Sequence, residues 1–292
     1  MIKLPDSLPF VCLIFFLCFL NCSNNCQANQ SPGKSAVQEG EKTFQWPDGA
    51  RAAVCLTYDD GIDGHLDIAA PDLEEVNLRG SFYAQGSSHS LAERMEDWRA
   101  LVDRGHELGN HSLFHPCIRT MPDGEVREWL RPEYAFENYT VRQIAAELKI
   151  ANTLLQAVDG KPERTYAYTC SDHLAGGESF VDEIRPLFTA ARTGGDNIVA
   201  DMRTLDIHLV PSWGVVDVSG EAMIDFVKKA EGAGTMAVFM FHGVGGGHNL
   251  NVSRESHRKL IAYLNAHRDR IWTGTFAQVM DHVRSERHRL GF

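Results

Sequence analysis

The alternation of apolar strand-like runs with amphipathic helical segments constrains the fold of this 292-residue chain more than any other feature. After residue 50, short apolar runs alternate with segments whose hydrophobic side chains recur at helical spacing. Strands are predicted at 52–58, 81–84, 106–110, 164–168, 189–192, 207–210, 236–241 and 271–273. Helices are predicted at 66–78, 90–105, 140–160, 179–188, 220–231, 254–268 and 276–288. This order predicts an α/β fold with a parallel sheet and right-handed crossovers.

The number of predicted strands bears on the shape of that sheet. Seven or eight parallel strands fit an open sheet or a closed barrel, and periodicity alone leaves both open. No dinucleotide-binding glycine fingerprint follows the first strand, so a barrel is favoured. Three helix starts carry a capping-box pattern, in which Ser90, Thr140 or Thr275 is followed three positions later by Glu or Gln.

The N-terminal segment differs from the rest of the chain. Residues 10–20 form an unbroken apolar run of 11 residues, which is too short to span a bilayer but fits a secretory signal. We expect a signal peptide at 1–28, a flexible linker at 29–45 and one folded domain at 46–288. The protein is then exported, as a periplasmic, cell-surface or secreted protein without a transmembrane span. Lipid attachment at Cys22 or Cys26 is the alternative to a soluble product.

Charge and cysteine content exclude some classes of partner. The formal net charge of −11 argues against nucleic acid, because phosphate binding needs a basic surface. Beyond the predicted signal, the chain keeps Cys55, Cys117 and Cys170. Three cysteines do not form a disulfide framework. A Cys117–Cys170 bridge with one buried thiol and three unpaired cysteines remain alternatives. The sequence does not predict the oligomeric state.

Polar side chains cluster where the predicted strands end. Asp59 and Asp60 follow the first strand, His111 and His115 follow the third, and His242 follows the strand at 236–241. The carboxyl ends of parallel strands meet at one face of the fold, so we expect these side chains to lie together.

These residue types suit metal-assisted hydrolysis. Two histidines four positions apart can reach one ion, and a carboxylate completes a His₂Asp set with an open position for water. A second carboxylate can take a proton from that water, and a histidine opposite can protonate a leaving group. Two adjacent carboxylates also repel unless a cation lies between them.

Three motifs carry a family resemblance. LTYDDG at 56–61, NHSLFHP at 110–116 and FHGV at 241–244 resemble the polysaccharide deacetylases, the NodB-homology group or carbohydrate esterase family 4. The resemblance covers about 46–288, so that domain would be the catalytic one. It implies a distorted parallel (β/α) barrel of about seven to eight strands and removal of acetyl groups from a glycan. It also implies one divalent metal ion, usually zinc, with cobalt, nickel or manganese as alternatives.

Roles follow for the matching positions. Asp59 would be the general base and His242 the general acid. Asp60, His111 and His115 would be the metal ligands. The substrate would be an acetylated carbohydrate, either a polymer or oligomer that contains N-acetylglucosamine or an O-acetylated xylan.

The chain departs from the family at the third motif, where an arginine normally contacts the catalytic aspartate. Here the stretch contains Tyr168, Thr169 and Cys170, and a backbone N–H among them would help to hold the oxyanion. We hypothesise that Arg192, at the exit of the strand at 189–192, supplies the missing charge to Asp59.

Other aromatic and histidine residues are weaker candidates. Trp213 is either a sugar-stacking residue or an ordinary aromatic at the barrel rim. The long excursion at 116–139, which contains Trp129, is expected to wall the substrate groove. His248 follows a Gly-rich run and fits a surface or substrate contact better than a ligand.

Two other functions remain open at this point. The altered third motif allows a carbohydrate-binding module without catalysis on the same fold. The fold also allows a hydrolase of another non-peptide C–N bond.

Overall fold

The computed structural model describes residues 43–292. The predicted signal peptide and residues 29–42 of the predicted linker lie outside the described residues. Within 43–292, no helix is both long and apolar enough to cross a membrane.

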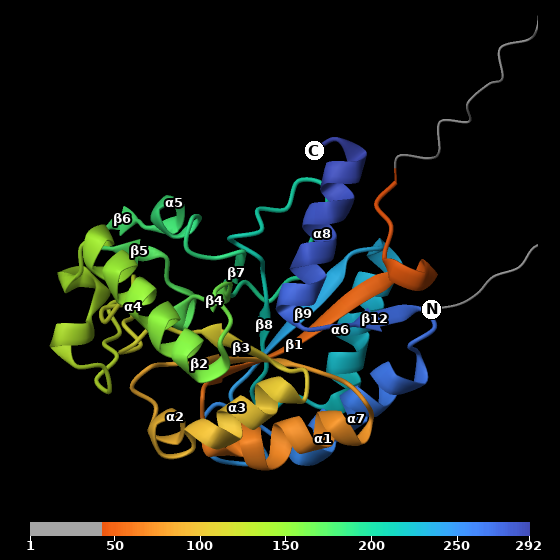
Figure 1. Cartoon of the computed structure of the whole chain (residues 1–292), viewed down its shortest axis with the longest axis horizontal. Coiled ribbons are helices and arrows are strands. Elements are labelled where there is room, and N and C mark those ends of the chain that lie inside the picture. The colour runs from red at the N-terminus through yellow and green to blue at the C-terminus, as the bar shows by residue number, and fades with distance from the viewer. Residues whose placement is uncertain (1–42) are drawn as a thin grey trace, which may run out of the picture. The chain divides into compact units, whose positions relative to one another are not determined.

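A curled parallel sheet forms the centre of the fold (Figure 1). Its strands are β1 (Ala52–Asp60), β2 (Ser81–Ala84), β3 (Glu107–Asn110), β4 (Thr165–Ala167), β7 (Ala190–Arg192), β8 (Trp213–Gly214), β9 (Met236–Phe241) and β12 (Ile271–Thr273). The order is β7-β4-β3-β2-β1-β9-β8, and β12 pairs with the first residues of β1. Two short pairs lie outside the sheet: β5 (Leu174–Ala175) with β6 (Glu178–Ser179), and β10 (Gly243–Val244) with β11 (Asn251–Val252).

The sheet is a distorted barrel, as the sequence predicts, but one expected strand is wrong. Residues 207–210 form no regular strand and contribute only an isolated bridge between Val210 and Arg192. This segment hydrogen-bonds to Ala191 of β7 through the Ile207 carbonyl and the Val210 N–H, and β8 just after it pairs with β9. Residues 207–210 therefore occupy the place of the closing strand of a regular barrel. They close the gap between β7 and β8 without forming a regular strand.

Helices surround the sheet, with α8 on one side of the strands and α1 and α3 on the other (Figure 1). They are α1 (Ala70–Glu75), α2 (His89–Glu93), α3 (Met95–Asp103), α4 (Val141–Asp159), α5 (Val181–Ile184), α6 (Gly220–Ala233), α7 (Arg254–Ala266) and α8 (Phe276–Leu290). A π-helical turn, His65–Ala69, leads directly into α1. The helix predicted at 179–188 is reduced to the single turn of α5.

Two of the three predicted capping boxes are confirmed. The Thr140 and Thr275 hydroxyls each accept the third backbone N–H of their helix, and the glutamine there accepts the N–H of the cap residue. The prediction at Ser90 is wrong, because Ser88 caps α2 and the Ser90 hydroxyl accepts a hydrogen bond from the Trp98 indole. Two serines two positions apart satisfy the local pattern equally well, so tertiary contacts decide between them.

The core lies on both faces of the sheet. All nine residues of β1 are buried, which explains its nearly continuous apolar sequence. Ala52, Val54 and Leu56 pack in one hydrophobic cluster, while Ala53 and Cys55 pack in another with the apolar face of α8. The carboxyl ends of the central strands are therefore held rigidly, and the polar residues that follow them form the site.

Candidate active site

The end of β1 presents two adjacent carboxylates. Asp59 and Asp60 are its last residues, and Gly61 turns the chain away with a φ of 63°. A Cβ at Gly61 would lie 2.9 Å from the Cβ of Ala84 on the neighbouring strand. Only glycine fits this turn without strain, which explains the Asp-Asp-Gly sequence.

Strained backbone is concentrated around the site. Of nine described non-glycine residues with positive φ, five lie just at or after the exits of β1, β3 and β4: Asp60, Ser112, His115, Cys170 and Ser171. Such conformations cost free energy and persist where surrounding structure enforces them, commonly at functional sites.

Asp60, His111 and His115 converge on one point. The Asp60 Oδ1 atom lies 3.5 Å from His111 Nε2 and 3.3 Å from His115 Nε2. The three ligand atoms lie within 4.8 Å of one another. Asp60 Oδ1 is buried and has no hydrogen-bond partner among the described residues. One carboxylate and two imidazoles facing one another in this way fit a divalent metal ion.

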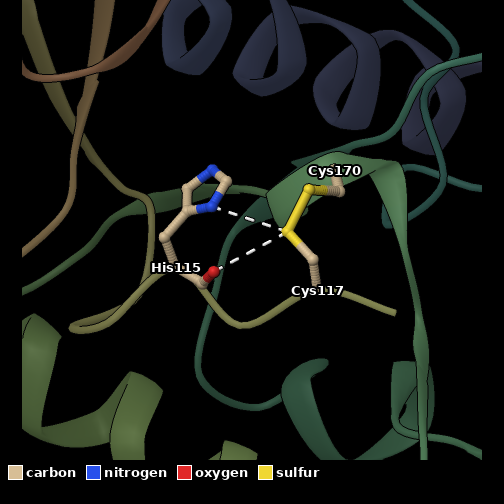
Figure 2. Close-up of side chains that lie close together, drawn as sticks. All are labelled: His115, Cys117 and Cys170. Atoms are coloured by element: carbon tan, nitrogen blue, oxygen red, sulfur yellow. Dashed lines mark hydrogen bonds between the residues drawn. A yellow bond between two sulfur atoms is a disulfide. The ribbon is translucent and has the colours of Figure 1, made fainter. Parts of the chain in front are cut away.

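Hydrogen bonds on the far side of each ring determine which nitrogen faces Asp60. The His111 Nδ1–H donates to the Ala167 carbonyl at 2.8 Å. His115 Nδ1 lies 3.5 Å from the Cys117 sulfur (Figure 2). That sulfur is in a disulfide and has no proton, so the ring donates. Both Nε2 atoms are thereby left with their lone pairs directed at the site, which is the tautomer that a metal requires.

A disulfide joins Cys117 to Cys170 and so connects the segments that follow β3 and β4 (Figure 2). This resolves the cysteine alternatives in favour of one bridge, with Cys55 as the buried free thiol among the described residues. His115 and the two sulfurs also lie within 4.8 Å of one another. They do not form a second ligand set, because sulfurs bonded to each other are not thiolates.

Asp59 forms an ion pair with Arg192 at the end of β7, which agrees with the hypothesis drawn from the sequence. Both side chains are buried, and the guanidinium carbon lies 5.0 Å from the centre of the Tyr83 ring. Burial raises the pKa of Asp59, but Arg192, with His111 and His242 adding to it, outweighs burial and lowers that pKa below its ordinary value. Asp59 is therefore an ionised carboxylate at neutral pH.

His242 follows β9 and faces the two aspartates. Its backbone carbonyl accepts a hydrogen bond of 3.0 Å from the buried His65 Nε2. Burial lowers the pKa of His242, and Asp59 and Asp60 oppose that effect without cancelling it. A lowered pKa makes the protonated ring a stronger proton donor.

His248 lies closer to the site than the sequence suggested. Its ring stacks on His242, with centroids 5.1 Å apart, and its Nε2 lies 3.4 Å from Asp60 Oδ2. The His248 Nδ1 accepts the Leu250 backbone N–H at 3.0 Å, so the proton of the neutral ring is on Nε2. His248 thus donates toward Asp60 and offers it no lone pair. No local pattern indicates this contact, because a Gly-rich loop returns His248 to the site.

A cavity of about 820 Å³ opens above these groups. Its lining includes Asp59, Asp60, His111, His115 and His242. The excursion at 116–139 contributes a wall through residues at 127–134, as predicted, and His248–Leu250 contribute another.

The weaker candidates from the sequence divide into two groups. Cys170 lines the cavity, whereas Tyr168, Thr169, Arg192 and Trp213 do not. Tyr168 and Thr169 are buried, and the Thr169 hydroxyl donates to the Pro116 carbonyl. The Trp213 ring packs on Phe226 and Phe239, with centroids 5.0 and 6.0 Å away.

The comparisons with known proteins agree with this geometry. Residues 47–176, just under half of the chain, match the family model of the polysaccharide deacetylases. The peptidoglycan-N-acetylmuramic acid deacetylase PdaA of Bacillus subtilis (strain 168) is 25% identical over 114 residues, which are 39% of this chain and 36% of PdaA. The chain thus matches about a third of the length of that curated relative. The chain is thus similar to the polysaccharide deacetylase family over residues 47–176.

Solved structures show the same fold. A Mycobacterium smegmatis protein assigned as a polysaccharide deacetylase aligns with a TM-score of 0.53 and 17% identity, covering 83% of this chain and 93% of that one. The Xyl-CE4 domain of a multidomain xylanase from the hindgut metagenome of Trinervitermes trinervoides aligns with a TM-score of 0.51 and 14% identity. That alignment covers 78% of this chain and 89% of the domain.

Proposed function

We propose that this protein is a metal-dependent hydrolase that removes acetyl groups from a glycan. One observation carries the proposal: two histidines with fixed tautomers and one carboxylate converge beside a second, ionised carboxylate and a histidine. A set of ligands, a base and an acid in one cavity supports hydrolysis over binding alone. The family match and the resemblance to PdaA, which acts on peptidoglycan N-acetylmuramic acid, support an acetylated carbohydrate as the substrate.

Asp60, His111 and His115 would hold the metal ion. The buried and unpartnered Asp60 Oδ1 atom and the two inward Nε2 atoms fit zinc, with cobalt, nickel or manganese as alternatives. When bound, such an ion supplies a water of lowered pKa and polarises the acetyl carbonyl.

Asp59 and His242 would move the protons. Asp59 is kept ionised by Arg192, so its carboxylate can accept a proton from the attacking water. His242 would donate a proton to the nitrogen or oxygen that leaves with the sugar. Arg192 is fully buried and would act through Asp59 without touching substrate. A backbone N–H near Cys170, which lines the cavity, would help to hold the oxyanion.

His248 would be a positioning residue. Its Nε2–H approaches Asp60 Oδ2, while the two ligand histidines face Oδ1. It would therefore hold the carboxylate so that one oxygen is directed at the ion.

The domain organisation and export are proposals as well. Residues 46–288 would be the catalytic domain, preceded by a linker at 29–45 and a signal peptide at 1–28. Peptidoglycan, the substrate named for PdaA, lies outside the cell membrane, which supports export. N-terminal sequencing of the protein recovered from the cell exterior tests the cleavage site.

Acetate release is the decisive experiment. Purified protein would be assayed on acetylated chitooligosaccharides, peptidoglycan and acetylxylan, first with zinc and then with a chelator. Chelator-sensitive acetate from one substrate supports the proposal and identifies the polymer. Glycan binding without acetate, from protein that holds one metal ion, would contradict it and favour a binding module.

A further inference from the structure

We propose that the glycan carries carboxylate groups beside the acetylated sugar, and that Arg131 and Trp129 recognise that anionic sugar. The inference rests on the proposed deacetylase function and narrows its substrate class. It is carried by an exposed arginine and an exposed tryptophan in the cavity wall.

The charge balance of the cavity differs from that of the protein, because its lining contains as many basic as acidic side chains. The chain has 39 acidic and 28 basic side chains. The lining contains two carboxylates, Asp59 and Asp60, and two guanidiniums, Arg127 and Arg131. Asp59 is neutralised by Arg192, and Asp60 is surrounded by histidines. Arg127 is paired with Asp172, so Arg131 is the cationic group of the lining without a close partner, which favours an anionic ligand.

The two arginines have different partners. Arg127 Nη1 donates to the Ile118 carbonyl at 2.7 Å and to Asp172 at 3.0 Å, so it holds the wall in place. Arg131 is 74% exposed, and its one carboxylate neighbour among residues 43–292, Glu133, is 4.0 Å away and itself 59% exposed. Such a pair contributes little, so the Arg131 guanidinium is available to a ligand.

An exposed tryptophan lies between them in the sequence. Trp129 lines the cavity although it is 63% exposed, and Phe114 and Leu250 beside the same cavity are also exposed. Exposed large apolar side chains gathered at one cavity indicate a binding surface. The Trp129 ring centroid is 6.2 Å from that of His115, so a sugar stacked on the indole would lie next to the metal ligands.

This combination fits one ligand chemistry. An indole face packs on the apolar face of a pyranose, and a guanidinium binds a carboxylate through two parallel hydrogen bonds. The carboxylate could belong to a carboxyalkyl ether on an amino sugar or to a neighbouring uronic acid. The experiment includes one substrate of each kind.

The test compares matched glycans that differ only in charge. Acetylated muramic-acid-containing glycan strands and an acetylated uronic-acid-containing oligosaccharide are used as they are and after reduction of their carboxyl groups to alcohols. We expect kcat/KM for acetate release to fall about tenfold or more on reduction of one of the two, since hydrogen bonds to charged groups are strong. The more sensitive glycan identifies the source of the carboxylate. Added salt should shrink the difference.

Variants locate the effect. Arg131→Gln should abolish the preference, and Trp129→Ala should raise KM on both forms. Arg142→Gln is the matched control, because Arg142 is exposed on α4 and does not line the cavity. Equal kcat/KM on charged and reduced glycans, or a preference that survives in Arg131→Gln, would overturn the inference and leave the proposed function intact.

A binding measurement separates the two proposals. The Asp59→Asn variant is titrated with each charged glycan and its reduced form. Tighter binding of a charged form, lost with Arg131→Gln, supports the inference even where acetate release fails. Equal binding of both forms contradicts it.

Discussion

The two halves of the site are built in different ways. Asp60, His111 and His115 come from the exits of β1 and β3, inside the segment that matches the family model. Asp59 is paired with Arg192, which is 133 positions further along the chain, and is completed by His242 after β9. The half that contains the three candidate metal ligands, the ligand half, thus depends on short motifs, whereas the half around Asp59 depends on closure of the barrel.

The difference between the halves shows where this chain can depart from the polysaccharide deacetylases that it resembles. The ligand half keeps its spacing, because two histidines on one short segment must both face Asp60. In the other half an arginine from β7 reaches Asp59, although the third motif lacks one. A charge at the centre of a barrel can be supplied from any strand whose end faces it.

The largest expected effect separates the two halves by function. Asp59→Asn should keep the metal and lower kcat by about 10²–10⁴-fold, because only proton transfer is lost. Asp60→Asn and His111→Ala should lose the metal first. Metal content per protein, measured alongside acetate release, distinguishes these variants. Normal turnover by Asp59→Asn would contradict the assignment of Asp59 as the general base.

The next effect is on stability. Arg192→Met should lower the free energy of unfolding by about 3–5 kcal/mol, because it leaves the buried Asp59 carboxylate without its partner. Urea unfolding measures the loss. The double variant Asp59→Asn/Arg192→Met should recover much of it, since no buried charge is then unpaired. Failure to recover would mean that packing of Arg192 on Tyr83 matters more than the ion pair.

Removing the disulfide should affect the ligand half. Cys117→Ser/Cys170→Ser should cost about 2–4 kcal/mol of stability and weaken metal binding, because His115 loses its sulfur partner. Metal affinity is measured by competition with a chelator. The Cys55→Ser variant keeps the bridge and serves as the control for loss of a buried sulfur, and equal metal affinity in all three proteins would contradict the coupling.

Variants of His248 test its contact with Asp60. His248→Ala should weaken metal binding about tenfold, the lower end for partners that orient a ligand. His248→Gln can still donate a hydrogen bond and should restore part of the affinity. The exposed His288→Ala is the control. A Gln variant as weak as the Ala variant would mean that stacking on His242, and not donation to Asp60, is what matters.

The smallest expected effect is at the ion pairs between α1 and α7, which do not line the cavity. Asp72 on α1 is buried and accepts hydrogen bonds from Arg254 and Arg258 on α7. Burial raises the pKa of Asp72, but the two arginines outweigh it and lower that pKa to about 2. The folded pKa is below the unfolded one, so this stability is present above about pH 4 and is lost as the pH falls toward 2.

The arginines are nearly half exposed, so we expect these ion pairs to contribute only about 1 kcal/mol to the free energy of unfolding. Urea unfolding at pH 6 and pH 3 measures it. Asp72→Asn should show a smaller loss between these pH values than the wild type does. Equal losses would place the acid sensitivity elsewhere.

Local patterns predicted much of this molecule. Apolar runs gave seven of the eight strand positions, and the caps at Thr140 and Thr275 were also correct. The exit residues of β1, β3 and β9 indicated which side chains share the cavity. These predictions succeed because spacing along a strand or helix fixes where a side chain points. The strand at 207–210 and the cap at Ser90 failed, since pairing partners and packing decide such choices.

The sequence by itself determined the fold class, most of the strand ends and the short motifs that contain the three candidate metal ligands, because each of these depends on neighbours only a few positions apart. Only the tertiary structure decided that Arg192 meets Asp59, that Cys117 pairs with Cys170 and that His248 turns back to Asp60. Each of these contacts joins segments whose separation is set by closure of the barrel. Spacing along the chain carries no information about such distances until the strands are in place.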